Sequence, residues 1–105
     1  MRLKNNKKDT TMKEINRRKS VFGGTFIYIE EGTGDGCFLH AAIKVYDNPS
    51  EAYGLDGGKI SVMTIDSIHA DGCHAMVANY DRGWDVTPAH PDVKNFVENI
   101  KKQYN

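Results

Sequence analysis

Alternation of apolar and polar residues along the chain predicts a series of β-strands. In the run CFLHAAIKVY, Leu39, Ala41 and Ile43 recur at every second position. Because alternate residues of a strand point to opposite faces, this apolar set should face a core. Runs rich in β-branched and aromatic residues predict strands at 25–30, 37–46, 59–66, 74–81 and, shorter, 84–86.

The apolar spacing changes to a helical period near the C-terminus. Pro91 suits the first turn of a helix, and Asp92 complements the positive end of its dipole. One apolar stripe then follows the spacing of an amphipathic helix: Val93, Phe96, Val97, Ile100 and Tyr104. We therefore expect an α+β fold, an antiparallel β-meander of four to five strands with one C-terminal helix packed on a face.

Charge is distributed unevenly along the chain. Residues 1–20 contain eight Lys or Arg against two acidic residues, with no sustained apolar period. They predict a mobile basic arm, with a short helix around Met12–Arg18, that is either a solvated tail or a binding arm. Residues 21–105 form the predicted single α+β domain, with six basic and twelve acidic residues. An acidic body argues against nucleic acid as a partner, because phosphate contacts dominate that binding.

A chain of 105 residues can bury only a modest core, so we expect a homo-oligomer, a dimer or larger. The basic start is not followed by the apolar segment of a signal peptide, and no run is long enough to span a membrane. With two cysteines, both expected to be reduced, the predicted location is the cytoplasm.

Metal binding and covalent catalysis are weakly indicated. Cys37 and His40, and likewise His69 and Cys73 with His74, have spacings found in zinc sites. Strand geometry puts residues three apart on opposite faces, so Cys37 and His40 should not converge. A thiolate–histidine dyad would lack a third orienting group. We predict no metal site, no cofactor and no catalytic residues.

The segment NYDRGWD (79–85) is the most unusual stretch of the chain. One interpretation is structural: it forms a hairpin in which Gly83 takes a positive φ, Trp84 covers the edge of the core and Tyr80 pairs across strands. This interpretation does not require the arginine or the second aspartate.

The other interpretation of the segment is a ligand site. Tyr80 or Trp84 would stack on a flat base, and Arg82 would clamp a phosphate or carboxylate. Asn79 and Asp85 would bond ribose hydroxyls or base edges.

Three residues outside the segment are candidate contributors to such a site. Lys44 shares a strand face with Phe38 and Tyr46, an arrangement that suits either a solvated face or the floor of a nucleotide pocket. Lys59 begins the next strand, and Tyr53 lies in the connection between the two.

Motifs in the second half of the chain resemble those of a family of short phage and prophage proteins of unknown function. They are KVYDNPSEAYGLDGGKIS (44–61) and VANYDRGWDVTP (77–88), followed by the final helix. The resemblance implies a phage protein, in the cytoplasm of an infected bacterium, and supplies no activity. Small phage proteins of this size often counter host defence, some as sponges that capture a nucleotide signal.

From these observations we expect a non-enzymatic protein that sequesters a nucleotide-derived immune signal, of the ADP-ribose or cyclic nucleotide type. A second subunit would complete its pocket. One alternative is an inhibitor that binds a host defence protein through its acidic surface. Another is an enzyme that cleaves the signal.

Overall fold

The computed structural model describes residues 12–34 and 36–105. Six strands, a short 3₁₀ turn and one α-helix follow one another along the chain. Their bounds are β1 Lys13–Lys19, β2 Thr25–Gly32, β3 Phe38–Val45, η2 Leu55–Gly57, β4 Ile60–Ile68, β5 His74–Asp81, β6 Trp84–Val86 and α1 Pro91–Tyr104. None of the helices among these residues has the length and apolarity to cross a membrane.

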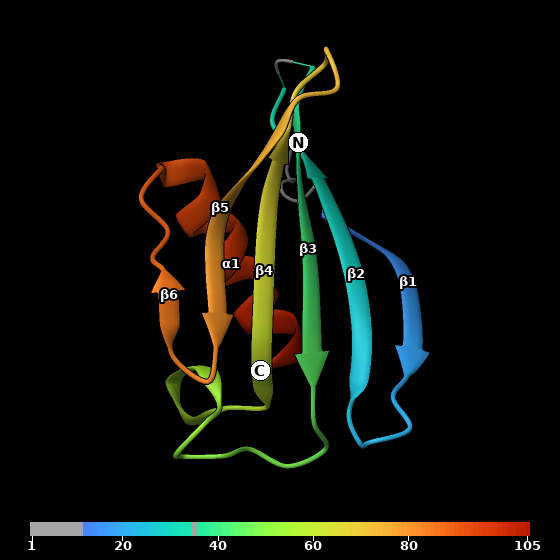
Figure 1. The fold of residues 1–105 in the computed structure, drawn as a ribbon, viewed down its shortest axis with the longest axis vertical. Helices are drawn as coiled ribbons and strands as arrows, with labels where there is room; N and C mark the ends of the chain where they lie inside the picture. The colour runs from blue at the N-terminus through green and yellow to red at the C-terminus, as the bar shows by residue number, and fades with distance from the viewer. Residues whose placement is uncertain (1–11, 35) are drawn as a thin grey trace, which may run out of the picture.

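The strands form one six-stranded antiparallel meander in the order β1-β2-β3-β4-β5-β6, as Figure 1 shows. Each strand pairs with its neighbour in sequence; the connections are short except that between β3 and β4, a longer loop of residues 46–59 that contains η2. The predicted α+β meander with one helix is confirmed, with one strand more than the four to five expected.

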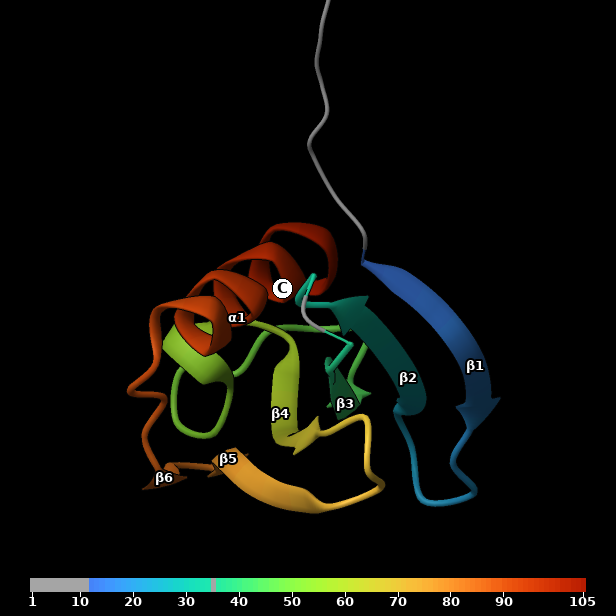
Figure 2. The same cartoon turned by 90° about the horizontal axis from the view of Figure 1, so that it is seen from above.

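Helix α1 covers one face of the sheet, which curves around it (Figure 2). The predicted inner set is buried: Leu39, Ala41 and Ile43 are at most 3% exposed. The apolar stripe of the helix is buried against them. The helix begins as predicted at Pro91, preceded by His90, whose ring accepts a hydrogen bond from the backbone NH of Asp92 at 3.1 Å.

No helix of the described residues covers the opposite face of the sheet, which we call the open face. Its side chains alternate with those of the core. In the register, Phe26 pairs with Lys44 and Lys44 pairs with Val62. On the next strand, Val62 pairs with Asp81. Aromatic rings gather on it, among them Phe38 and Tyr46, both more than a third exposed.

The helix predicted around Met12–Arg18 is wrong, because residues 13–19 form the edge strand β1. This strand lies inside the predicted arm of residues 1–20; residues 1–11 of that arm lie outside the described residues. The strand escaped prediction because all seven of its side chains are exposed, so no alternation of apolar and polar residues marks it.

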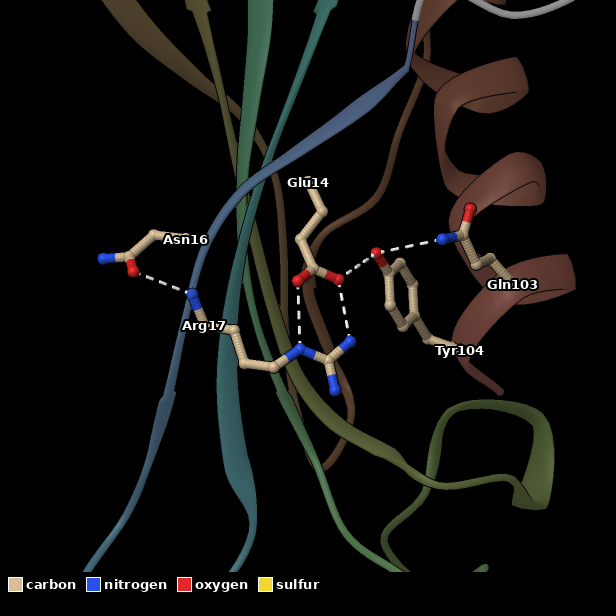
Figure 3. Close-up of polar contacts among 5 residues, drawn as sticks. All are labelled: Glu14, Asn16, Arg17, Gln103 and Tyr104. Carbon is tan, nitrogen blue, oxygen red and sulfur yellow. Dashed lines mark hydrogen bonds and ion pairs between the residues drawn. The ribbon is translucent and has the colours of Figure 1, made fainter.

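A polar cluster ties β1 to the end of α1, as Figure 3 shows. Arg17 donates two hydrogen bonds to the Glu14 carboxylate, at 2.9 and 2.8 Å, and the Tyr104 hydroxyl donates to the same carboxylate at 2.8 Å. The bonds from Arg17 hold the pKa of Glu14 below its ordinary value. Burial, together with the neighbouring Glu14 carboxylate, raises the pKa of Tyr104 to about 12. The strand is thus attached to β2 by its backbone ladder and to α1 by hydrogen bonds to the Glu14 carboxylate.

Candidate functional site

The NYDRGWD segment forms the hairpin between β5 and β6, with Arg82 and Gly83 as its loop. Both loop residues have positive φ, 58° for Arg82 and 158° for Gly83. The positive φ predicted for Gly83 is confirmed, but the left-handed position belongs to Arg82. The loop is held by bonds from the NH of Asp81 to the Gly83 carbonyl at 2.9 Å, and from the NH of Arg82 to the Ser61 carbonyl at 3.1 Å.

The two large rings of the segment lie on the core side of the sheet. Tyr80 is 7% exposed and meets Trp84 edge to face, with ring centroids 5.2 Å apart. Trp84 lines a cavity of about 410 Å³ beside α1, with Leu55 and Val97 among its neighbours. The structural interpretation therefore accounts for these two residues, which were also predicted to stack on a ligand.

Asn79 and Asp85 pin the hairpin to the sheet. The Thr64 hydroxyl donates to the Asn79 side chain at 2.8 Å, and Asn79 donates to the Asp85 carboxylate at 3.3 Å. This chain of bonds crosses β4, β5 and β6. The structure thus gives both predicted ligand-binding residues a role within the sheet.

The remaining predicted site residue of the segment, Arg82, lines a hollow of about 430 Å³ on the open face, which we call the Arg82 hollow. Two other predicted residues line it too, Lys44 and Tyr53. The structure therefore brings together three of the eight predicted site residues. The full lining is Lys44, Tyr46, Ser50, Tyr53, Ser61, Val62, Asp81 and Arg82.

Cations and rings alternate in this hollow. The Arg82 guanidinium carbon lies 5.9 Å from the centroid of the Tyr53 ring, and the Lys44 ammonium lies 5.3 Å from that of Tyr46. The Arg82 Nε is 3.6 Å from a carboxylate oxygen of Asp81, and both side chains are more than half exposed. Such an exposed pair contributes little to stability, so both groups remain available to a ligand.

The loop between β3 and β4 positions Tyr53. Its carbonyl accepts the Tyr80 hydroxyl at 3.1 Å, and its NH donates to the Ser50 hydroxyl at 3.1 Å. The next residue must be glycine, because a Cβ on Gly54 would overlap the Gly58 carbonyl. The buried tyrosine of the hairpin therefore holds the exposed tyrosine of the loop in place beside Arg82.

Five lining residues were not predicted as ligand contacts: Tyr46, Ser50, Ser61, Val62 and Asp81. Tyr46 was placed beside Lys44 on one face, and that placement is correct. Asp81 belongs to the segment but was assigned only to the turn. Ser61 reaches the hollow through a bulge, since Lys44 pairs with Val62 while Val45 pairs with Ile60. Alternation cannot indicate a bulge, so no signal in the sequence placed this serine.

Lys59 lies apart from the Arg82 hollow. It lines a smaller hollow of about 240 Å³, with Arg17 and Tyr104 of the polar cluster. Its carbonyl accepts the NH of Tyr46 at 3.0 Å, so its backbone helps to fix the strand that carries Lys44.

The cysteines and histidines gather at the other end of the sheet. Cys37 Sγ lies 3.5 Å from Nδ1 of His69, and both line a hollow of about 280 Å³. His40 instead lies near Tyr28, with ring centroids 6.3 Å apart. Across residues 12–34 and 36–105, no three His, Cys, Asp or Glu side chains are grouped to hold a metal ion.

Comparison with known proteins places the chain in a family. No curated protein and no solved structure matches it. Residues 28–105 match a domain of unknown function, DUF7678, which spans β2 from its fourth residue, the Arg82 hollow and α1. The chain is therefore a member of the DUF7678 family.

Proposed function

We propose that the protein binds a nucleotide-derived anion in the Arg82 hollow and holds it without cleaving it. The observation that carries this proposal is the backbone of Arg82, whose φ of 58° lies in the left-handed region. A residue other than glycine there costs about 1–2 kcal/mol, and tight hairpins favour glycine, asparagine or aspartate at such positions. An arginine at this position is best explained by what its guanidinium binds.

Electrostatics support the same site. Residues 21–105 contain only six Lys or Arg, and two of them line this hollow. With Asp81 as the one carboxylate in the lining, the hollow is positive within an otherwise acidic domain. A phosphate would be attracted to Lys44 and Arg82, while Asp81 would accept hydrogen bonds from ribose hydroxyls.

The chemical groups in the lining favour binding over catalysis. Two tyrosine rings offer stacking surfaces, two serine hydroxyls and one carboxylate offer hydrogen bonds, and two cations offer charge. The histidine and thiol that lie together, His69 and Cys37, line a different hollow. We infer a protein that retains its ligand, which a second subunit would enclose.

The biological role that fits such a protein is capture of a signal. The motifs resemble those of short phage proteins, and a small phage protein that binds a nucleotide can act as a sponge for a signal of host immunity. In this proposal the ligand is of the ADP-ribose or cyclic nucleotide type, and the site of action is the cytoplasm of an infected bacterium.

A second candidate function is direct inhibition of a host protein by the acidic end of the sheet. Glu30, His40 and Asp66 pair side by side across β2, β3 and β4, far along the strands from Arg82. Lys13 pairs with Glu30 at the edge of this row, so its negative charge comes from the two carboxylates alone. Carboxylates aligned in this way can bind in a basic groove. Such an interface should weaken steeply with salt, whereas ligand stacking in the Arg82 hollow should weaken much less.

A thermal-shift panel tests the proposal, using ADP-ribose, its cyclised derivative, AMP and cyclic dinucleotides. A ligand present at a hundred times its Kd stabilises the fold by about 2.7 kcal/mol, which raises Tm by several degrees in a small domain. The bound ligand should be recovered intact after denaturation. A flat panel would overturn nucleotide binding, and recovery of a cleaved product would overturn retention.

Arg82→Gly is the matched variant for this panel. Glycine accepts the left-handed backbone freely, so the unliganded variant should melt at the wild-type temperature or slightly above it. The ligand-induced rise in Tm should disappear. A variant that keeps this rise would remove Arg82 from the site.

A further inference from the structure

A second hollow adjoins the Arg82 hollow on the open face. It has a volume of about 480 Å³ and lies at the turn between β1 and β2, at the same end of the sheet as the β5–β6 turn (Figure 1). We call it the Phe22 hollow; its lining is Arg18, Lys19, Ser20, Val21, Phe22, Phe26 and Lys44. Lys44 lines both hollows.

The Lys44 ammonium lies between two aromatic rings, one from each hollow. It is 5.3 Å from the ring centroid of Phe26, in the Phe22 hollow, and 5.3 Å from that of Tyr46, in the Arg82 hollow. The two centroids are therefore at most 10.6 Å apart. Contacts with both rings hold the cation at the boundary between the hollows.

Further cations lie at the two outer ends of this arrangement. The Arg18 guanidinium carbon lies 6.0 Å from the Phe26 ring centroid, and Arg82 lies over Tyr53 in the other hollow. Across the strands the register places Arg18, Phe26 and Lys44 side by side, and Tyr46 lies two residues along the chain from Lys44. Arg82 and Tyr53 form a further cation–ring pair. A nucleic-acid base can stack on an aromatic ring, and a phosphate pairs with an ammonium or guanidinium.

The turn between β1 and β2 leaves apolar surface for such a ligand to cover. Val21 is 92% exposed and Phe22 is 88% exposed, although both are apolar. Arg18 and Lys19 of the same turn place two cations beside this apolar surface. An anionic ligand with an aromatic ring satisfies both the charge and the apolar surface.

We propose that the two hollows together take a dinucleotide, with its bridging phosphate on Lys44 and one base in each hollow. This proposal rests on nucleotide binding in the Arg82 hollow and names the class of ligand. The β1–β2 turn lies before residue 28, where the family match begins, so the second base site is a feature of this chain's N-terminal hairpin.

Calorimetric titration with AMP, ADP and the linear dinucleotide pApA tests the proposal. ADP has one base and a charge similar to that of pApA, so it controls for added phosphate. The wild type should bind pApA about 5-fold to 150-fold more tightly than ADP, the range that one stacked base provides. Equal affinities for ADP and pApA would overturn the dinucleotide proposal.

Phe22→Ser and Arg82→Gly separate this proposal from the proposed function. Phe22→Ser should remove the advantage of pApA and leave AMP binding unchanged, whereas Arg82→Gly should weaken all three ligands. If AMP and ADP bind but Phe22→Ser leaves the affinity for pApA unchanged, nucleotide binding stands and the second base site is overturned. If no nucleotide binds, both proposals are overturned.

Discussion

The two faces of this sheet come from the same strands, yet they differ in burial and in the chemistry of their side chains. On the face toward α1, apolar side chains of the sheet such as Ile43 and Ile65 are almost fully buried, as is Phe96 of the helix that covers them. On the open face, rings, cations and carboxylates remain in contact with water, although the fold gains little from placing them there. The comparison indicates that the helix-covered face determines the fold, and the open face carries the proposed binding site.

The NYDRGWD segment divides between these faces residue by residue. Tyr80 and Trp84 lie on the core side, while Asp81 and Arg82 line the hollow of the open face. The hydroxyl of Tyr80 links the two faces, because it holds the backbone of Tyr53 at the rim of the hollow. The segment is therefore both a hairpin and part of a candidate site.

The largest expected effect is on the core face. Phe96→Ala should lower the free energy of unfolding by about 3–5 kcal/mol, because the side chain is fully buried and its loss leaves a cavity. The same change on the open face, Phe38→Ala, should cost about 1 kcal/mol or less, since that ring is 42% exposed. Denaturant unfolding measures both, and similar losses for the two variants would contradict the division between the faces.

A smaller effect is expected where the faces are linked. Tyr80→Phe keeps the buried ring but removes the hydrogen bond to the Tyr53 carbonyl. The free energy of unfolding should fall by about 0.5–1.5 kcal/mol. The nucleotide-induced rise in Tm should also shrink, because Tyr53 is then held less firmly. If denaturant unfolding shows an unchanged stability, the hydroxyl does not fix the loop.

The smallest effect should be on the attachment of β1 to α1, and it depends on pH. The raised pKa of Tyr104 means that its stabilising contribution is complete below about pH 10 and is lost as the pH rises toward 12. The lowered pKa of Glu14 has the opposite sign, so its contribution is present above the ordinary pKa of a carboxyl and is lost as the pH falls.

The tyrosinate absorbance of the wild type minus that of Tyr104→Phe isolates this residue among the five tyrosines of the chain. The difference curve should have its midpoint at about 12. A midpoint near the ordinary value of 10 would show that Tyr104 is not enclosed against Glu14.

Alternation was sufficient to predict most of the fold. The inner residues of β3 and the apolar stripe of α1 could be read from the sequence because burial on one side imposes a period. Strand β1 could not, since neither of its faces is buried. The contact between Glu14 of this strand and Tyr104 of α1 joins residues ninety positions apart, so it gives no local signal in the sequence.

The site was harder to predict than the fold. Lys44 and Arg82 were predicted as ligand contacts because cations are scarce in residues 21–105, and the structure places both, with Tyr53, around one hollow. Tyr80 and Trp84 are aromatic too, but the face of the sheet on which each lies depends on the register of the hairpin. That register shifts between Asn79 and Tyr80. Residue type thus indicated the kind of site, and only the backbone showed which residues reach it.

The most direct test of the division between the faces is a map of NMR shifts as AMP is added to isotope-labelled protein. We predict that the largest changes occur at Lys44, Tyr53 and Arg82, around the hollow of the open face. The indole NH of Trp84, the single tryptophan, should not shift, because it lies beside α1. Changes centred on Trp84 and Val97, with Arg82 unaffected, would contradict the account.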